Sequence, residues 1–400
     1  MYARHRLDIG LADLARAAAA RRGSGLPATP DGSLCCLSVR SGFHLLLRAL
    51  ELPAGGEVVF SALTHPDLPR LVERHGLVAV PVDLDRDTLA PRPGSLEAAL
   101  SPRTRVVVVA HLFGGLVDLA PVAELTRRAG ALLVEDCAQA YAGPDSEDGD
   151  PLAAVSMFSF GLLKTATAVG GAILRVRDER LLARMTGIQA AWPVQAEGAY
   201  LAGVARCAAF LAASEPLAYG LLMGAHRAAG RDFDAWVNAA VRSLPAPSGA
   251  ELVRRLELRP CPSLRLTIDR RRAGFDAGRL ARRADGGEAA IELLPAGLLH
   301  PGDRMLRRTH WLFPVVASDP DALVAAARAA GFDAARAASN LHAVPAPPDR
   351  PGLSPTVAAA MLDRLVYLPM YPEIPWRDRR RLLTDVLGAS RAPWLVREGR

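Results

Sequence analysis

Apolar and polar residues follow two kinds of pattern along this chain, most clearly between residues 30 and 190. Short runs rich in Val and Leu predict strands, whereas apolar residues that recur every three or four positions predict helices. The predicted strands cover residues 57–62, 78–82, 105–112, 131–136, 156–160 and 172–176, and the predicted helices cover 42–50, 66–74, 119–128 and 178–185. This alternation is typical of an α/β fold whose helices cover both faces of a parallel sheet.

The rhythm changes after residue 190. Residues 191–262 are rich in Ala, have a helical pattern and are punctuated by Pro, so we interpret them as a helical insertion. Residues 263–400 predict a smaller C-terminal α/β domain that opens with an arginine-rich helix. Its further predicted elements are a strand at 308–316, helices at 320–330 and 376–387, and a Pro-rich loop at 344–355. The expected organisation is an N-terminal arm over 1–30, a large domain over 31–190, the insertion and the small domain.

Composition narrows the class of protein. Half of the 400 residues are hydrophobic and 22% are charged, which excludes a largely disordered chain. The net charge of +6 is spread over a chain with 42 acidic residues and only 5% aromatics, so we expect no nucleic-acid partner. The five cysteines suit neither a disulfide framework nor a zinc site, and we expect no metal.

The N-terminus offers no signal-peptide pattern, and charged residues and a proline interrupt the most apolar long window, 199–225. We therefore expect no membrane span, and a cytoplasmic location.

A single lysine carries the strongest chemical signal. The chain contains 48 Lys and Arg residues, of which 47 are Arg and one is Lys164. A lysine amine can lose its proton and form an imine with a carbonyl, whereas arginine does neither at neutral pH. Lys164 follows a predicted strand and precedes Gly170 and Gly171, which places it in a loop. A stray surface lysine is the ordinary alternative, so the neighbouring residues must decide.

Three further polar features surround that lysine in the expected fold. Asp136 ends a predicted strand, and the carboxyl ends of parallel strands form the edge of a sheet where ligands bind. Ser41 and Gly42 open a predicted helix, whose N-terminus can bind phosphate, and Ser159 lies five residues before Lys164. An amine, a carboxylate and a phosphate site are the groups that pyridoxal phosphate requires. The alternatives are a helix N-cap for the carboxylate and turn positions for the hydroxyls.

These features resemble the DegT/DnrJ/StrS aminotransferases, the sugar aminotransferase branch of the fold type I pyridoxal-phosphate enzymes. The resemblance covers most of the chain outside the insertion. It rests on residues 7–10, 41–42, 56–59, 62–65, 111–114 with 118, 135–139, and 158–160 with 164. It implies a large domain with a mostly parallel seven-stranded sheet and a smaller C-terminal α/β domain, assembled as a homodimer.

The resemblance also implies roles for individual residues. Lys164 would carry the cofactor as a Schiff base and move protons, and Asp136 would pair with the pyridine nitrogen. The remaining cofactor contacts would come from Ser41, Gly42 and Ser159 at the phosphate, and from His65 and Gln139 at the ring. The alternative to a cofactor contact for His65 and Gln139 is simple packing. His111 lies near the end of a predicted buried strand, so we expect a structural histidine there.

The chain departs from the family pattern at several positions. Phe43 replaces a usual threonine, His65 replaces a bulkier aromatic, and Gly161 replaces a common histidine. A family segment that contributes contacts across the dimer, Asn-x-Arg-Met-x-x-x-Gln, is not recognisable.

The resemblance implies an amino-acid donor such as glutamate and a nucleotide-linked keto sugar as acceptor. The alternatives are a lipid or secondary-metabolite ketone as acceptor, and a non-catalytic relative that binds the cofactor as a regulator or partner subunit.

Overall fold

The computed structural model describes residues 1–20, 29–241, 250–336 and 340–388. Its centre is a seven-stranded sheet with the strand order β1-β9-β8-β7-β5-β2-β4. These strands are β1 (Ser33–Cys36), β2 (Glu57–Ser61), β4 (Val78–Val82), β5 (Thr104–Ala110), β7 (Leu132–Asp136), β8 (Val155–Ser159) and β9 (Ala172–Val176). The five neighbouring strands β4, β2, β5, β7 and β8 run parallel to one another, and β9 is antiparallel to β8 and β1. The predicted fold class is confirmed.

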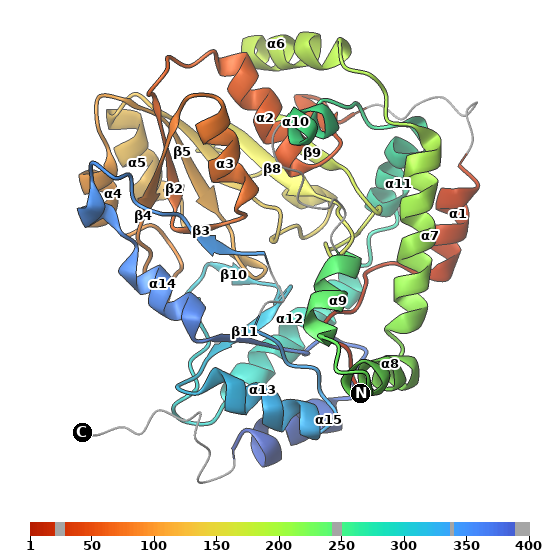
Figure 1. The fold of residues 1–400 in the computed structure, drawn as a ribbon. Helices are drawn as coiled ribbons and strands as arrows, with labels where there is room; N and C mark the ends of the chain where they lie inside the picture. Colours follow the sequence, from red (N-terminus) through yellow and green to blue (C-terminus); the bar gives the residue numbers. More distant parts are fainter. Residues whose placement is uncertain (21–28, 242–249, 337–339, 389–400) are drawn as a thin grey trace.

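Helices pack on both faces of this sheet (Figure 1). They are α1 (Leu11–Ala18), α2 (Val39–Leu50), α3 (Asp67–Arg74), α4 (Pro93–Ala99), α5 (Ala120–Arg128), α6 (Glu179–Ala190), α7 (Glu197–Ala213), α10 (Ala250–Leu256) and α11 (Pro262–Ala273). Successive side chains of a strand point to opposite faces, so Val106 and Val108 pack in the layer of α2, α3, α6 and α10. Val107 and Val109 pack in the layer of α4 and α5. The unbroken valine run of β5 is therefore buried on both sides.

The predicted insertion is helical. It contains α7, α8 (Pro216–Ala228), α9 (Phe233–Val241) and α10. The buried side chains Tyr200 and Cys207 of α7 join the core that covers the β8–β9 end of the sheet, together with α1 and α11. Among the described residues no single helix has the length and apolarity to cross a membrane; α7 and α8 reach that level only as a pair, which is bent by 91°.

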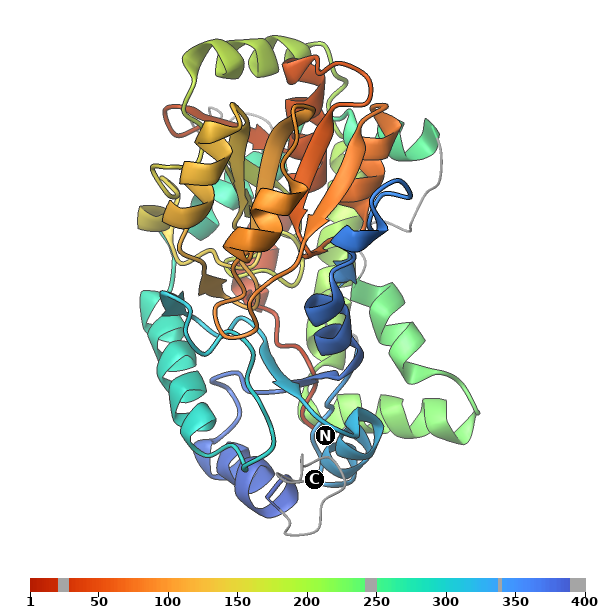
Figure 2. The same cartoon turned by 90° about the vertical axis from the view of Figure 1, so that its left-hand side faces the viewer.

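The C-terminal unit lies at the end of the large unit where the parallel strands finish (Figure 2). Its elements are α12 (Ala277–Glu292), β10 (Arg307–Arg308), β11 (Phe313–Val316), α13 (Pro320–Ala329), β12 (His342–Ala343), α14 (Thr356–Asp363), β13 (Leu365–Leu368), α15 (Trp376–Arg381) and a π-helical turn at Leu382–Val386. Two short pairings join the units: β10 pairs with β6 (Gly115–Leu116), and β12 pairs with β3 (Leu63–Thr64). Short 3₁₀ turns lie at Pro144–Ser146 and Pro351–Leu353.

The prediction of a single strand over residues 308–316 is wrong. It divides into β10 and β11 because His310 adopts a positive φ of 46°. The residues between the two strands contact the large unit, where the Thr309 N–H donates to Gly114 O over 2.8 Å. The interruption brings Trp311 against the loop that contains Lys164.

Candidate active site

Lys164 lies in the loop that connects β8 to β9, as the sequence predicts. Its backbone N–H donates to Gly161 O over 2.9 Å, and the Ala166 N–H donates to the Asp8 carboxylate over 2.7 Å. Ala166 and Val169 have positive φ values of 54° and 67°. The N-terminal arm and these left-handed residues therefore hold the loop in one conformation.

The Lys164 amine packs against an aromatic ring. Its Nζ lies 4.1 Å from the centroid of the Trp311 ring, and the Trp311 Nε1–H donates to Leu163 O over 2.8 Å. Burial lowers the pKa of Lys164 from 10.5 to about 8, although the charge of Asp136 acts in the opposite direction. A larger fraction of this amine is therefore unprotonated near neutral pH than in an exposed lysine.

Asp136 ends β7, beside the strand that leads to Lys164. The residue is 8% exposed, and its Oδ1 accepts from the Ala138 N–H over 2.9 Å. Burial raises the pKa of Asp136, while the Ala138 hydrogen bond and the charges of Lys164 and His111 oppose that rise. A buried carboxylate with so few partners fits a cationic or N–H-bearing ligand group.

The other residues expected near the cofactor occupy the same edge of the sheet. Ser159 ends β8 and is buried, and its Oγ lies 3.4 Å from the Gly161 N–H. Gln139 Oε1 accepts from the Phe113 N–H over 2.8 Å, which ties the turn after β7 to the loop after β5.

His65 follows β3, and its Nδ1 accepts from the Asp67 N–H over 3.2 Å. Its pKa is lowered to about 4 by burial and by the charges of Arg40 and Lys164. The ring is therefore neutral at physiological pH.

The structure corrects the start of the helix at which the phosphate site is predicted. Helix α2 begins at Val39, not at residue 42, because Ser38 is its N-cap and accepts from the Ser41 N–H over 3.1 Å. Ser41 is fully buried, and its hydroxyl donates to Leu256 O. Gly42 lies under Leu174: an added Cβ would stand 2.4 Å from Leu174 Cδ1. In this structure Ser41 lies in the first turn of the helix and Gly42 directly after it, and both face the interior.

The start of α2 instead lies at the edge of the sheet that carries Ser159. The Gly171 N–H donates to Leu37 O over 3.0 Å, and the Phe160 N–H donates to Gly171 O over 3.0 Å. Ser38 follows Leu37, so the N-terminus of α2 and the end of β8 are neighbours. Arg40, in the first turn, pairs with Asp67 over 2.7 Å.

Three functional candidates escaped the sequence analysis. Trp311, which the pattern assigned to the core, contacts the Lys164 amine. Arg283 of α12 lines a cavity that Lys164 also lines, and Arg40 stands beside His65. Because the chain contains 47 arginines, the sequence does not single out Arg40 or Arg283. No local pattern identifies Trp311 as a residue of the C-terminal unit that contacts the large unit.

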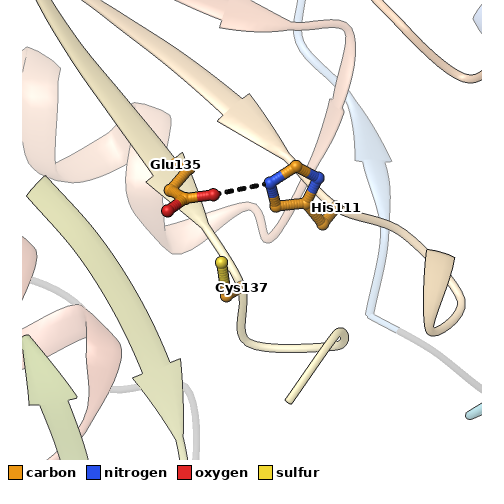
Figure 3. A group of neighbouring side chains, drawn as sticks. All are labelled: His111, Glu135 and Cys137. Carbon is orange, nitrogen blue, oxygen red and sulfur yellow. Dashed lines mark hydrogen bonds and ion pairs between the residues drawn. The ribbon is translucent and has the colours of Figure 1, made fainter. Parts of the chain in front are cut away.

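A second polar cluster, His111, Glu135 and Cys137, has the spacing of a metal site (Figure 3). His111 Nε2 lies 2.8 Å from Glu135 Oε2, and His111 Nδ1 accepts from the Val117 N–H over 3.0 Å. Since Nδ1 accepts, Nε2 carries the proton and donates to the carboxylate. Both ring nitrogens of His111 therefore have hydrogen-bond partners within the fold.

Residues 32–200 match the family model of the DegT/DnrJ/EryC1/StrS aminotransferase family. Solved structures are similar to this chain over nearly its whole length. Their sequence identities are low, so the similarity shows the fold. The aminotransferase TlmJ from Streptoalloteichus hindustanus is 19% identical with a TM-score of 0.62, covering 96% of this chain and 92% of its own. The sugar aminotransferase CalS13 from Micromonospora echinospora is 21% identical with a TM-score of 0.58, covering 96% and 93%.

A putative sugar aminotransferase from Streptococcus pneumoniae, solved in its PLP form, is 15% identical with a TM-score of 0.64. The match covers 96% of this chain and 97% of that one. The family model thus matches residues 32–200 to the family that the sequence motifs resemble, and the solved structures show the fold.

Proposed function

We propose that this chain is an aminotransferase of the DegT/DnrJ/EryC1/StrS family with pyridoxal phosphate as its cofactor, and that it transfers an amino group from an amino acid to the keto group of a sugar. One observation carries the proposal: the sole lysine of 400 residues is a partly buried amine of lowered pKa at the edge of the sheet where Asp136 also lies.

Lys164 is the residue that we assign to covalent attachment and proton transfer. When bound, pyridoxal phosphate supplies an aldehyde that carries the amino group and a ring that stabilises negative charge on the substrate carbon. With a pKa of about 8, roughly a tenth of the Lys164 amine is unprotonated at pH 7. Once displaced by the donor, the same amine acts as the base that takes the proton from the substrate carbon and later returns it.

Asp136 is assigned to the pyridine nitrogen. Its buried carboxylate would hold a proton on that nitrogen, and the positive ring would in turn favour the ionised carboxylate. Its low exposure of 8% keeps water away from this hydrogen bond. We propose ring contacts for His65, neutral because of its lowered pKa, and a neighbouring supporting role for Gln139.

The phosphate is assigned to the true start of α2. The first turn of a helix presents unpaired N–H groups and the positive end of its dipole, and here those groups belong to Val39 and Arg40. Ser159 supplies a hydroxyl from the neighbouring strand. Ser41 and Gly42 then support this site only by anchoring the helix.

Glutamate is the donor that we propose, and a nucleotide-linked keto sugar the acceptor, in a cytoplasmic homodimer. The family match and the neighbouring sugar aminotransferases support this substrate class. The test is to load the protein with pyridoxal phosphate and glutamate, add nucleotide-linked keto sugars, and follow amino-sugar products by mass spectrometry. Product formed by the wild type and not by Lys164→Ala supports the proposal; 2-oxoglutarate released without any aminated sugar would remove the sugar as acceptor.

A further inference from the structure

The N-terminal arm contacts the loop that carries Lys164 through one carboxylate. Asp8 Oδ2 accepts from the Ala166 N–H over 2.7 Å, two residues after the lysine. Ala166 is fully buried, and its positive φ of 54° is a conformation that residues with a Cβ rarely adopt. Since a buried backbone N–H needs a hydrogen-bond partner, Asp8 fixes the loop at a strained position.

Asp8 is itself held firmly. The apolar residues on either side of it, Leu7 and Ile9, pack in the same core as the loop. Its second carboxylate oxygen, Oδ1, lies 3.3 Å from Arg279 Nη1 of α12, and its main-chain oxygen accepts from Arg271 of α11. The Asp8 side chain is 18% exposed. The arm therefore presents this carboxylate to the loop in a defined position.

The two arginines do not depend on Asp8 for a counterion. Arg271 Nη1 pairs with Asp13 over 2.9 Å, and Arg279 Nε pairs with Glu373 over 2.7 Å. Their distances to the Asp8 carboxylate are longer, at 3.7 and 3.3 Å. The hydrogen bond to the loop has no such substitute among the described residues. It is therefore the contact for which Asp8 matters most.

Other segments hold the residues next to the lysine. Trp311 Nε1–H donates to Leu163 O over 2.8 Å, and Arg283 Nη2 donates to Thr165 Oγ1 over 3.2 Å. The lysine Nζ lies 4.1 Å from the centroid of the Trp311 ring. Asp8 holds the next residue along the chain, so the loop is fixed on both sides of the lysine while the amine lies against the ring.

We propose that Asp8 is a positioning residue for the Schiff-base lysine: its carboxylate holds the Ala166 N–H and thereby keeps the Lys164 amine buried against Trp311. The proposal rests on the proposed function, because that function attaches the cofactor to this lysine. Burial lowers the pKa of Lys164 from 10.5 to about 8. A loop released from the arm would expose the amine to water, and the pKa of Lys164 would rise toward its ordinary value.

The test measures the titration of Lys164 in the cofactor-free full chain. Lys164 is the sole lysine, so competitive labelling with acetic anhydride and peptide mass spectrometry separate its reactivity from that of the N-terminal amine. We expect a midpoint near 8 in the wild type and a midpoint at least about 1 pH unit higher in Asp8→Ala. Covalent attachment of pyridoxal phosphate at pH 7 should then slow by about tenfold, because less of the amine is unprotonated.

Asp13→Ala is the matched control. Asp13 belongs to the same arm and also pairs with Arg271, while its other partners are Arg16 and the Gly10 N–H. This variant loosens the arm without removing the hydrogen bond to the loop, so its midpoint should stay near that of the wild type. An Asp8→Ala midpoint equal to that of Asp13→Ala would overturn the proposal. Both variants leave intact the other ionisable side chains that act on the amine or bind its loop, which are Asp136, His65, Arg283 and Tyr200.

Two further substitutions decide the question even where Asp8→Ala does not fold. Asp8→Asn keeps an acceptor oxygen at the same position and loses the charge, whereas Asp8→Glu keeps the charge and displaces the oxygen by one methylene group. We expect the Lys164 midpoint to stay near 8 in Asp8→Asn and to rise in Asp8→Glu. The reverse order, or equal midpoints in the two variants, would overturn the proposal.

The labelling experiment is independent of the proposed function, because it contains no cofactor or substrate. A wild type that forms no covalent cofactor adduct at Lys164 would contradict the proposed function, while the midpoints of the cofactor-free variants would still show whether Asp8 positions the lysine. Unaltered midpoints beside normal cofactor attachment would contradict the role of Asp8 alone.

Discussion

Lys164 differs from the arginines around it because it can become neutral within the physiological pH range. Only the unprotonated amine attacks the aldehyde of the cofactor. Since its pKa is lowered from 10.5 to about 8, the rate at which the apoprotein binds pyridoxal phosphate covalently should rise with pH around 8. Stopped-flow absorbance across pH 6–10 measures this rate. A midpoint that stays near 10.5 would contradict the assigned environment.

Asp136 makes a second prediction at the same scale. Its negative charge raises the pKa of Lys164, against the lowering caused by burial. Asp136→Asn should therefore move the midpoint of cofactor attachment to lower pH, and it should also slow transamination by ~10²-fold or more, because the ring nitrogen loses its ionic partner. An unchanged midpoint, with attachment still measurable, would show that the two groups are not coupled.

Sequence reasoning reached some of these residues and not others, for a physical reason. Lys164 and Asp136 could be placed near each other because Asp136 ends one strand and Lys164 follows the next, and the carboxyl ends of parallel strands lie at one edge of the sheet. Trp311 and Arg283 could not, since they enter the site from the C-terminal unit. No local pattern specifies how that unit packs against the large one.

Helix α2 begins at Val39, about one turn before the start predicted at residue 42. This difference changes which residues lie at the helix N-terminus, where we propose that the phosphate binds. Hydrophobic periodicity identified the helix, but its start depends on the N-cap, and Ser38 and Ser41 are both suitable capping residues. The structure selects Ser38. Ser41 then points into the interior, where Leu256 accepts its hydroxyl.

The two serines should therefore respond differently to substitution. Ser38→Ala removes the cap at the proposed phosphate site, so it should weaken pyridoxal phosphate binding and cost about 1 kcal/mol of stability. Ser41→Ala should cost a similar free energy of unfolding, through its lost hydrogen bond, with cofactor affinity nearly unchanged. Equilibrium dialysis and denaturant unfolding measure the two effects. Equal loss of cofactor affinity in both variants would restore Ser41 as a direct ligand.

Gly42 offers a test of the packing between α2 and the sheet. An added Cβ would stand 2.4 Å from a methyl group of the fully buried Leu174, so Gly42→Ala should destabilise the protein by about 1–2 kcal/mol even though alanine favours helices. Gly94→Ala in α4 is the control, because no atom lies within 4 Å of its added Cβ. We expect that variant to be neutral or slightly stabilising. Equal stability of the two variants would contradict the close packing.

At the scale of the whole molecule, buried ion pairs join the N-terminal arm to the C-terminal unit. Arg4 contacts Asp333 over 2.7 Å, and the Asp333 side chain is fully buried, where it also accepts from Arg328 and the Tyr219 hydroxyl. The N-terminal segment, α8 and the C-terminal unit thus meet at one carboxylate. This junction could not be predicted, because Arg4 and Tyr219 are each separated from Asp333 by more than 100 residues in sequence.

Removing that carboxylate should therefore loosen the whole assembly. Asp333→Ala leaves the buried Arg4 without its main partner and should lower the free energy of unfolding by about 3–5 kcal/mol. Asp321→Ala, which breaks an exposed pair with Arg336, should cost less than about 1 kcal/mol. Urea unfolding compares them. A cost for Asp333→Ala no larger than that of its control would show that the arm is not held by this pair.

The most direct measurement maps the position of the covalently bound cofactor. The chain has only two kinds of amine, the Lys164 side chain and the N-terminal α-amino group, so borohydride reduction of the loaded protein followed by peptide mass spectrometry gives an unambiguous assignment. We predict that the cofactor mass lies on the peptide containing Lys164, and that prior addition of glutamate removes it. Label confined to the N-terminus, or Lys164 left unmodified at saturating cofactor, would contradict the proposed active site.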